Sequence, residues 1–150
     1  MAASAQEQRR NRLSALAKAP ADRLQALWSK IGEEPEHRLI RGPEFGSVMV
    51  RGRAGGTGAP FNLGEVTVTR CSVALADGTV GHGYVQGRSA AAARIVALAD
   101  ALAEAGQHDL IEAGLVAPLE EERVAKRKAR ARKAAATKVD FFTMVRGEAT

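Results

Sequence analysis

The residues best suited to bind a ligand are a glycine-rich loop and three arginines around it. The loop, Arg53-Ala-Gly-Gly-Thr-Gly-Ala-Pro60, contains three glycines, Gly55, Gly56 and Gly58. Glycine allows positive φ and close backbone approach, and backbone N–H groups in such a loop can bind phosphate oxygens. If the flanking segments pair as strands, Arg51, Arg53 and Arg70 can lie near the ends of the loop. Their guanidinium groups can then form paired hydrogen bonds to phosphate or carboxylate.

Two interpretations of this loop stay open. It is not a Walker phosphate loop, because the final Gly-Lys-Ser/Thr is missing and no helix is expected to follow it. Anion binding therefore requires the three arginines to converge beside the loop. The alternative is a tight crossing of two strands at an interface, where glycines serve close backbone packing.

The isolated nucleophiles and bases form no recognisable catalytic set. His82 has the chemistry of a general base, but its apolar neighbours favour a packed or interfacial histidine. Cys71 is the single cysteine, which excludes an internal disulfide and a cysteine-based zinc site, and we expect a buried, inert thiol. His37, His82 and His108 lack the spacing of metal ligands. We assign no catalytic residue and no metal site.

The positive charge of the chain lies in one segment. The net charge is +5, but residues 123–138 contain eight Lys or Arg and no acid, and the rest has 14 basic against 17 acidic residues. Binding of RNA or DNA is one interpretation of this segment. The other is a solvated helix or a protein-docking arm, which the lack of interleaved aromatic residues favours.

The elements around the loop predict a small antiparallel sheet on residues 46–87. Asp77-Gly78 is the signal for a two-residue hairpin turn. That turn would place Val73 opposite His82 and Cys71 opposite Tyr84 on one face. The second face would hold only small residues, which a helix or a partner chain could approach closely: Ser72, Ala74, Gly81 and Gly83.

The remaining segments predict helices around this sheet, and therefore an α+β fold in one domain, 1–150. Helices are expected over 3–18, 21–31, 89–104, 107–113 and 119–136, with a polar connection over 33–44 that holds a short strand at 37–41. The last helix is basic and an apolar tail, 139–145, follows it. Such a tail must return to the core or bind another chain, so Phe141, Phe142 and Arg146 join the candidate ligand or interface residues. No membrane span or signal peptide is expected, which indicates the cytoplasm.

Several short motifs, taken in order, resemble the PhnG family of bacterial phosphonate metabolism. They are Gly46-Ser-Val-Met-Val-Arg-Gly-Arg53, Gly55-Gly-Thr-Gly58, Val68-Thr-Arg70, Asp77-Gly78, Val85-Gln-Gly-Arg88 and Val139-Asp-Phe-Phe-Thr-Met-Val-Arg-Gly147. The resemblance covers nearly the whole chain.

The resemblance implies a subunit of the cytoplasmic carbon–phosphorus lyase system. Members of the family act with subunits H, I and L in making α-D-ribose 1-methylphosphonate 5-triphosphate, where methylphosphonate displaces adenine from MgATP. Subunits G, H, I and J form a core complex. The resemblance therefore implies an accessory subunit that binds no cofactor itself, and it transfers no catalytic residue. The alternatives are a self-contained nucleotide-binding enzyme that uses the glycine loop and a nucleic-acid-binding protein that uses 123–138.

Overall fold

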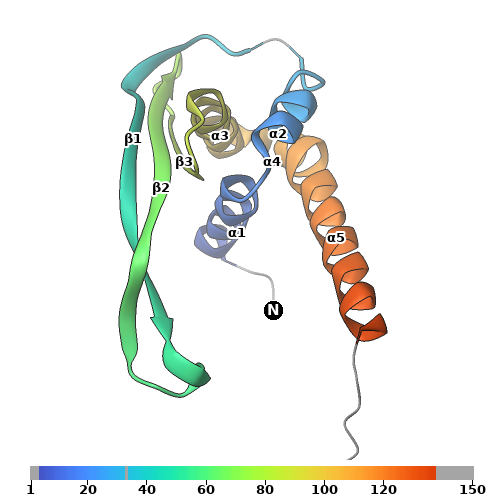
Figure 1. Ribbon diagram of the computed structural model, residues 1–150. Helices are drawn as coiled ribbons and strands as arrows, with labels where there is room; N and C mark the ends of the chain where they lie inside the picture. Colours follow the sequence, from blue (N-terminus) through green and yellow to red (C-terminus); the bar gives the residue numbers. More distant parts are fainter. Residues whose placement is uncertain (1–3, 33, 138–150) are drawn as a thin grey trace, which may run out of the picture. The chain divides into compact units, whose positions relative to one another are not determined.

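A three-stranded antiparallel sheet with helices on one face forms the larger part of the protein (Figure 1). The computed structural model describes residues 4–32 and 34–137. These residues fall into two compact units that divide between Glu120 and Glu121. The first unit holds the sheet, and the described part of the second is helical. The α+β prediction is confirmed, and the single domain over 1–150 stays a prediction.

The sheet has the order β1-β2-β3, and its strands differ greatly in length. They are β1 (His37–Arg53), β2 (Pro60–Leu75) and β3 (Val80–Gln86). β3 pairs only with the second half of β2, from Val68 to Ala74. Within the part of the chain that the structure describes, the first half of β2 therefore pairs only with β1. We call this two-stranded part, residues 47–53 and 60–67, the ribbon; the loop with the short turn η1 (Ala54–Gly56) closes it.

β1 begins earlier than expected. Residues 33–44 were predicted to be a polar connection with a short strand at 37–41, but one strand runs from His37 to Arg53. Pairing with β2 compensates for the weak preference of this segment for a strand. Pro43 does not prevent the pairing, because β1 is an edge strand, where a missing N–H is tolerated. The irregular sequence appears instead as register shifts, between Leu39 and Arg41 and between Arg41 and Glu44.

The hairpin between β2 and β3 turns through three residues rather than two. Leu75 N–H donates to the Thr79 carbonyl at 2.9 Å, so Ala76, Asp77 and Gly78 form the loop. Gly78 has φ of 87°, as expected for a three-residue loop that ends in a left-handed residue. The Asp-Gly signal located the turn correctly, but the extra loop residue moves the pairing by one position.

The register shift redistributes the side chains between the two faces of the hairpin. Cys71 lies opposite Gly83 and Val73 opposite Gly81, whereas His82 lies opposite Ser72. The predicted pairs Val73–His82 and Cys71–Tyr84 are therefore wrong. Because partners across a strand pair share a face, His82 lies on the face opposite to that of Val73 and Cys71. Both glycines are buried, and His82 is exposed on the other face.

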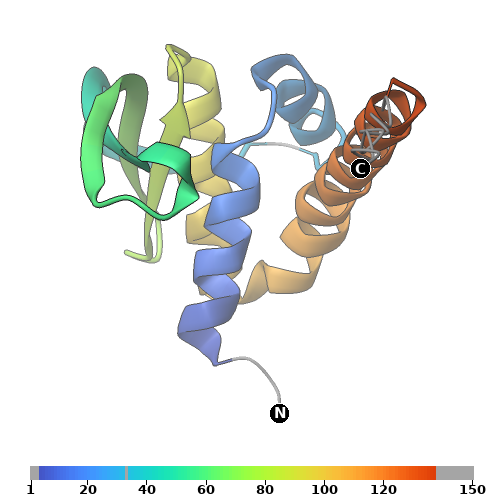
Figure 2. The ribbon, with the colours of Figure 1, turned by 60° about the horizontal axis from the view of Figure 1, so that its bottom comes forward.

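The helices follow the predicted segments closely. They are α1 (Ala5–Ala17), α2 (Ala21–Trp28), α3 (Ala90–Leu102), η2 (Ala103–Gln107), α4 (His108–Ile111), η3 (Glu112–Val116) and α5 (Ala117–Ala136). Ser89 caps α3 as predicted, accepting a hydrogen bond from the N–H of Ala92 at 3.2 Å. α1, α2 and α3 lie on the same side of the sheet, and no helix of the described residues covers its other face (Figures 1 and 2).

Gly81 and Gly83 let α3 pack directly onto the backbone of β3. A Cβ on Gly81 would overlap the carbonyl oxygen of Ala97, and one on Gly83 would overlap that of Ala93. The predicted face of four small residues does not form, because Ser72 and Ala74 lie on the other face with His82 and Val80. The close approach expected there does occur at the two glycines, and the element that approaches is α3. The core between sheet and helices contains fully buried side chains from every layer, including Leu16, Leu24, Val73, Leu98, Ile111 and Leu115.

We expect Gly83→Ala to lower the free energy of unfolding by about 3 kcal/mol, because the new methyl group forces α3 away from β3. Gly64→Ala is the matched control in the same sheet: its Cβ would meet no heavy atom within 4 Å, and we expect a change below about 0.5 kcal/mol. Urea denaturation of both variants measures the difference. Equal stabilities would show that α3 does not depend on close contact with β3.

Candidate functional site: the open sheet and the ion-pair network behind it

The glycine loop and two of the predicted arginines lie together at the end of the ribbon. Gly55 and Gly56 have φ of 61° and 79°, a conformation that glycine adopts without strain. Gly58 donates its N–H to the carbonyl of Ala54 at 3.1 Å, which closes the loop. Arg51 and Arg53 are exposed, and they form no ion pair with any residue that the structure describes. This end of the ribbon is therefore an available cationic surface.

Arg70 does not join them. Arg51 lies opposite Asn62, and Arg70 is eight residues further along β2, a separation of about 26 Å. The expected convergence of three arginines at the loop is wrong, because β2 stays paired with β1 through the whole interval. Arg70 Nε instead lies 3.1 Å from a carboxylate oxygen of Glu44, which also contacts Arg41 at 3.6 Å.

Arg70 and His82 lie on the helix-free face of the sheet, beside a hollow of about 570 Å³. Ile40, Ser72, Val80 and Tyr84 contribute to its lining. Ser72 Oγ and His82 Nδ1 lie 2.9 Å apart. No described carboxylate bonds the other ring nitrogen, so the pair lacks the third group that orients a base toward a nucleophile. His82 is exposed rather than packed, and its place in an interface stays a prediction.

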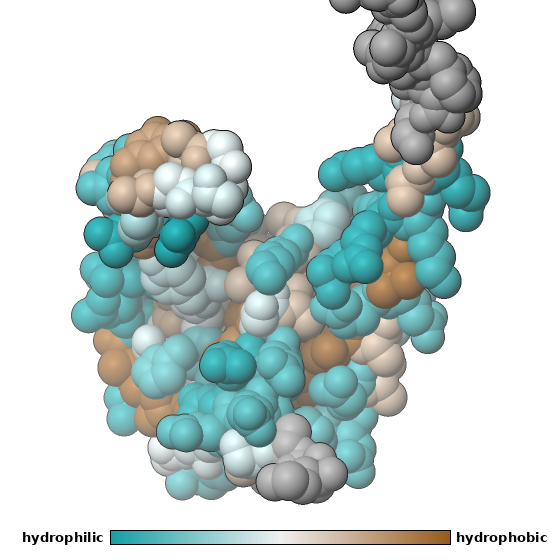
Figure 3. Space-filling model, turned by 90° about the horizontal axis from the view of Figure 1, so that it is seen from below, coloured by the Kyte–Doolittle hydropathy of each residue, from teal (hydrophilic) through white to brown (hydrophobic). Residues whose placement is uncertain are grey.

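Exposed apolar side chains are concentrated on the sheet. Among the described residues, nine of the eleven large hydrophobic side chains classed as exposed belong to β1, β2 or β3: Leu39, Ile40, Phe45, Val48, Met49, Phe61, Leu63, Val80 and Tyr84. Figure 3 views the protein from the loop end of the ribbon, and apolar patches reach the surface on the side of the sheet. A concentration of this kind marks a surface that binds another protein or a ligand.

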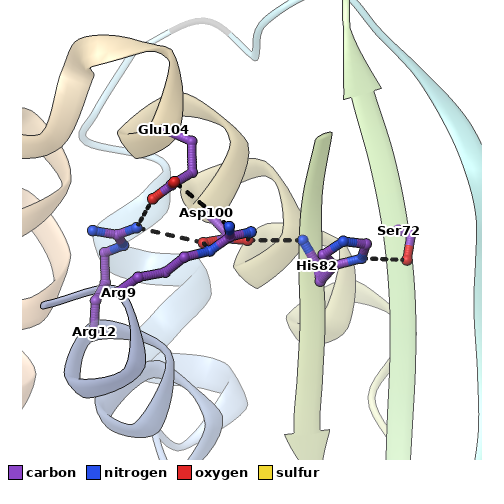
Figure 4. A network of polar contacts seen from close by, with 6 residues as sticks. All are labelled: Arg9, Arg12, Ser72, His82, Asp100 and Glu104. Carbon is purple, nitrogen blue, oxygen red and sulfur yellow. Dashed lines mark hydrogen bonds and ion pairs between the residues drawn. The ribbon is translucent and has the colours of Figure 1, made fainter. Parts of the chain in front are cut away.

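Behind the sheet, a buried carboxylate joins α3 to α1 and to β3 (Figure 4). Asp100 is fully buried. It accepts two hydrogen bonds from Arg9, at 3.1 and 2.7 Å, and a longer one from Arg12 at 3.4 Å. It also accepts the backbone N–H of His82 at 3.0 Å, a donor that the ladder with β2 leaves free. The carboxylate therefore fixes the position of β3 relative to two helices.

Two further side chains complete this network around Arg12. Arg12 is 3% exposed, and it donates to Glu104 at 2.7 Å and contacts His108 Nδ1 at 3.0 Å. A guanidinium has no acceptor, so this nitrogen of His108 is the acceptor and the ring proton lies on Nε2. The hydrogen bond to Asp100 raises the pKa of Arg9, which keeps its positive charge in the partly buried site.

Sequence reasoning missed this network, although a signal was present. Asp100, Glu104 and His108 recur every four residues, and Arg9 and Arg12 are three apart, which is the spacing of neighbours on one face of a helix. In the structure Gly106, with φ of 99°, interrupts the helix between Glu104 and His108. Asp100 is surrounded by alanines in the sequence, and nothing there marked it as a buried residue among the other charged residues. Asp100 is buried because α3 packs closely on β3. The wrong hairpin register did not identify α3 as the partner in this contact, because it placed the glycines of β3 on the face opposite to the large apolar side chains of the hairpin.

Cys71 is buried as predicted, at 1% exposure, and its Sγ lies 3.4 Å from the carbonyl oxygen of Arg41. Burial raises the pKa of the thiol. Within residues 4–32 and 34–137, no group of three or more His, Cys, Asp or Glu is placed to hold a metal ion. Phe141, Phe142 and Arg146, together with the apolar tail, lie outside the described residues.

The structure is therefore an α+β fold whose exposed large apolar side chains, among the described residues, lie mostly on the strands of its sheet. The comparisons with known proteins place this one: the chain belongs to the PhnG family, since the model of phosphonate metabolism protein PhnG matches residues 7–147. It is 46% identical over 141 residues to the alpha-D-ribose 1-methylphosphonate 5-triphosphate synthase subunit PhnG of Rhizobium meliloti (strain 1021). That match covers 94% of this chain and 90% of the relative. None of the helices in the described part has the length and apolar character needed to cross a membrane.

We expect Asp100→Asn to destabilise the fold by about 3 kcal/mol, because Arg9 and the deeply buried Arg12 lose the charge that balances them. Glu44→Gln is the control, since it removes a carboxylate from an exposed ion pair and should cost less than about 1 kcal/mol. Thermal and urea unfolding at neutral pH compare the two variants. A small effect of Asp100→Asn would mean that the network adds little to the stability of the fold.

Cys71 should resist alkylation in the folded protein. Its burial limits access and its raised pKa lowers the fraction of reactive thiolate. We expect iodoacetamide at pH 8 to modify the native protein at least about a hundredfold more slowly than the urea-unfolded chain, a ratio that follows the rarity of global opening. Mass spectrometry of timed samples gives both rates. Comparable rates would show that the thiol is accessible.

Proposed function

We propose that this chain is an accessory subunit of α-D-ribose 1-methylphosphonate 5-triphosphate synthase. The match to the Rhizobium meliloti subunit over 94% of the chain supports this assignment. In the proposal, the subunit acts with subunits H, I and L while methylphosphonate displaces adenine from ATP. It also belongs to a core complex with subunits H, I and J.

The observation that carries the proposal is the distribution of exposed apolar side chains. Nine of them lie on the sheet, and the face that holds Val80 and Tyr84 also presents Arg70. Aromatic residues and arginine are enriched at the centres of protein interfaces. A subunit that contributes binding surface rather than chemistry needs such a face, so the open sheet is the proposed contact with its partners.

In the proposal this subunit binds no cofactor of its own, and MgATP is used by the assembled complex. The glycine loop bears on this point. Its sequence is not that of a Walker loop, and strand β2 follows it rather than a helix whose N-terminus would face a phosphate. Arg51 and Arg53 still allow the loop to meet an acidic surface or a nucleotide held by a partner subunit.

The experiment is co-expression with subunits H, I and J, followed by affinity purification and size-exclusion chromatography. We expect wild-type protein to co-elute with them, and Tyr84→Ala to weaken the association about tenfold, because a half-exposed aromatic side chain on the sheet face is lost. Leu110→Ala is the control, since Leu110 is similarly exposed but lies on α4.

Activity measurements separate the proposal from its two alternatives. The purified chain alone should release no adenine from ATP, and release by it would support a self-contained nucleotide-binding enzyme. Tight binding of a random DNA duplex at about 150 mM salt would support the nucleic-acid alternative, because purely electrostatic attraction weakens steeply with salt.

A further inference from the structure

The outer edge of β1 is the edge of the sheet that the described residues leave open. The order β1-β2-β3 gives the sheet two edges. The β3 edge is closed, since its His82 N–H bonds to Asp100 and both α1 and α3 pack against this strand. No strand pairs with the outer side of β1 among residues 4–32 and 34–137. A long open edge is a template for the strand of another chain.

The hydrogen-bonding groups that face outward on β1 follow from the pairing. In β2, Thr67 accepts the N–H of Gly87 and Leu75 donates to Thr79, so its odd-numbered residues face β3. Two residues opposite one another in an antiparallel pair either both direct their backbone N–H and C=O groups toward each other or both direct them away from each other. For three of these odd-numbered β2 residues, the partners on β1 are Phe45, Ser47 and Met49. These three β1 residues therefore direct their N–H and C=O groups away from the sheet.

The two halves of β1 differ in how well they could accept a strand. The first half carries Pro43, two register shifts and charged side chains, which are features that block edge-to-edge pairing. The second half, Phe45–Val50, contains no proline and no charge, and its register with β2 is unbroken. Phe45 and Met49 are about half exposed, at 50% and 54%. Only this half is a regular, apolar, unprotected edge.

We propose that Phe45–Val50 is the docking site for an extended strand of a different subunit, which adds to the sheet through main-chain hydrogen bonds. The partner strand is apolar opposite this segment and acidic where it passes Arg51 and Arg53, whose guanidinium groups form no ion pair within the described part of the chain. The inference rests on the proposed function, because the partner belongs to the same complex. It adds where and how that partner binds.

A second copy of this chain fits the edge less well. Between Phe45 and Arg53 the sequence has two arginines and no acid, so an antiparallel copy brings no carboxylate from this segment to them. The nearest acid on the strand, Glu44, already contacts Arg70 at 3.1 Å and Arg41 at 3.6 Å. Charge complementarity therefore favours a different chain.

Hydrogen exchange tests the contact directly. The full chain is compared alone and in the complex co-purified with subunits H, I and J. We expect the amides of Phe45, Ser47 and Met49 to exchange at least about tenfold more slowly in the complex, because each gains an acceptor. Val48, whose amide already faces β2, should change less. Unchanged exchange at all three outward amides would overturn the proposal.

Substitution supplies an independent test. Ser47→Pro removes one outward N–H and should weaken co-purification at least about tenfold. Ser47→Ala keeps the N–H and should assemble like wild type, although it loses the hydrogen bond to Glu65. Met49→Lys keeps the backbone intact and places a charge at the edge, and it serves if circular dichroism shows that Ser47→Pro fails to fold.

The outcomes are distinguishable. If wild-type protein does not assemble with the other subunits, the proposed function fails. If wild type assembles and both Ser47→Pro and Met49→Lys assemble equally well, the edge proposal alone fails. If light scattering shows that the isolated chain is a dimer and that Met49→Lys makes it monomeric, the occupant of the edge is a second copy, which overturns the proposal of a different subunit.

Discussion

Direct backbone contact between α3 and β3 is the constraint on which the rest of the structure depends. It exists because Gly81 and Gly83 have no side chain where Ala97 and Ala93 approach. This short distance lets the Asp100 carboxylate reach the free N–H of His82, and Asp100 in turn holds Arg9 and Arg12 of α1. A single close contact thus leads to a closed edge, a satisfied buried charge and a fixed N-terminal helix.

The same arrangement makes the two edges of the sheet chemically different. On β3, the outward N–H of His82 bonds to Asp100, and α1 and α3 pack against the strand. On β1, the irregular first half is protected by Pro43 and its register shifts, whereas the second half continues into the ribbon without protection. The apolar side chains exposed on the sheet and the open backbone groups therefore lie on neighbouring surfaces, as an interaction subunit requires.

Local sequence signals predicted the elements well and their pairing less well. The Asp77-Gly78 turn and the Ser89 cap depend on residues close in sequence, and both were located correctly. The hairpin register was wrong because a three-residue and a two-residue loop share the same Asp-Gly signal. Arg70 was misplaced because the length of β1 is set by pairing with β2 rather than by its own sequence. Asp100 was missed because its burial depends on elements far apart in the chain.

The ribbon gives the protein a part with its own, lower local stability. A two-stranded hairpin is marginally stable in water, and this one has neither a third strand nor a buried side chain between residues 47–53 and 60–67. Its opening costs little of the free energy that holds the helices to β3, so it can unfold and refold while the core stays intact. A partner strand that pairs with this segment would also have to order it, and that cost would lower the affinity per unit of contact area.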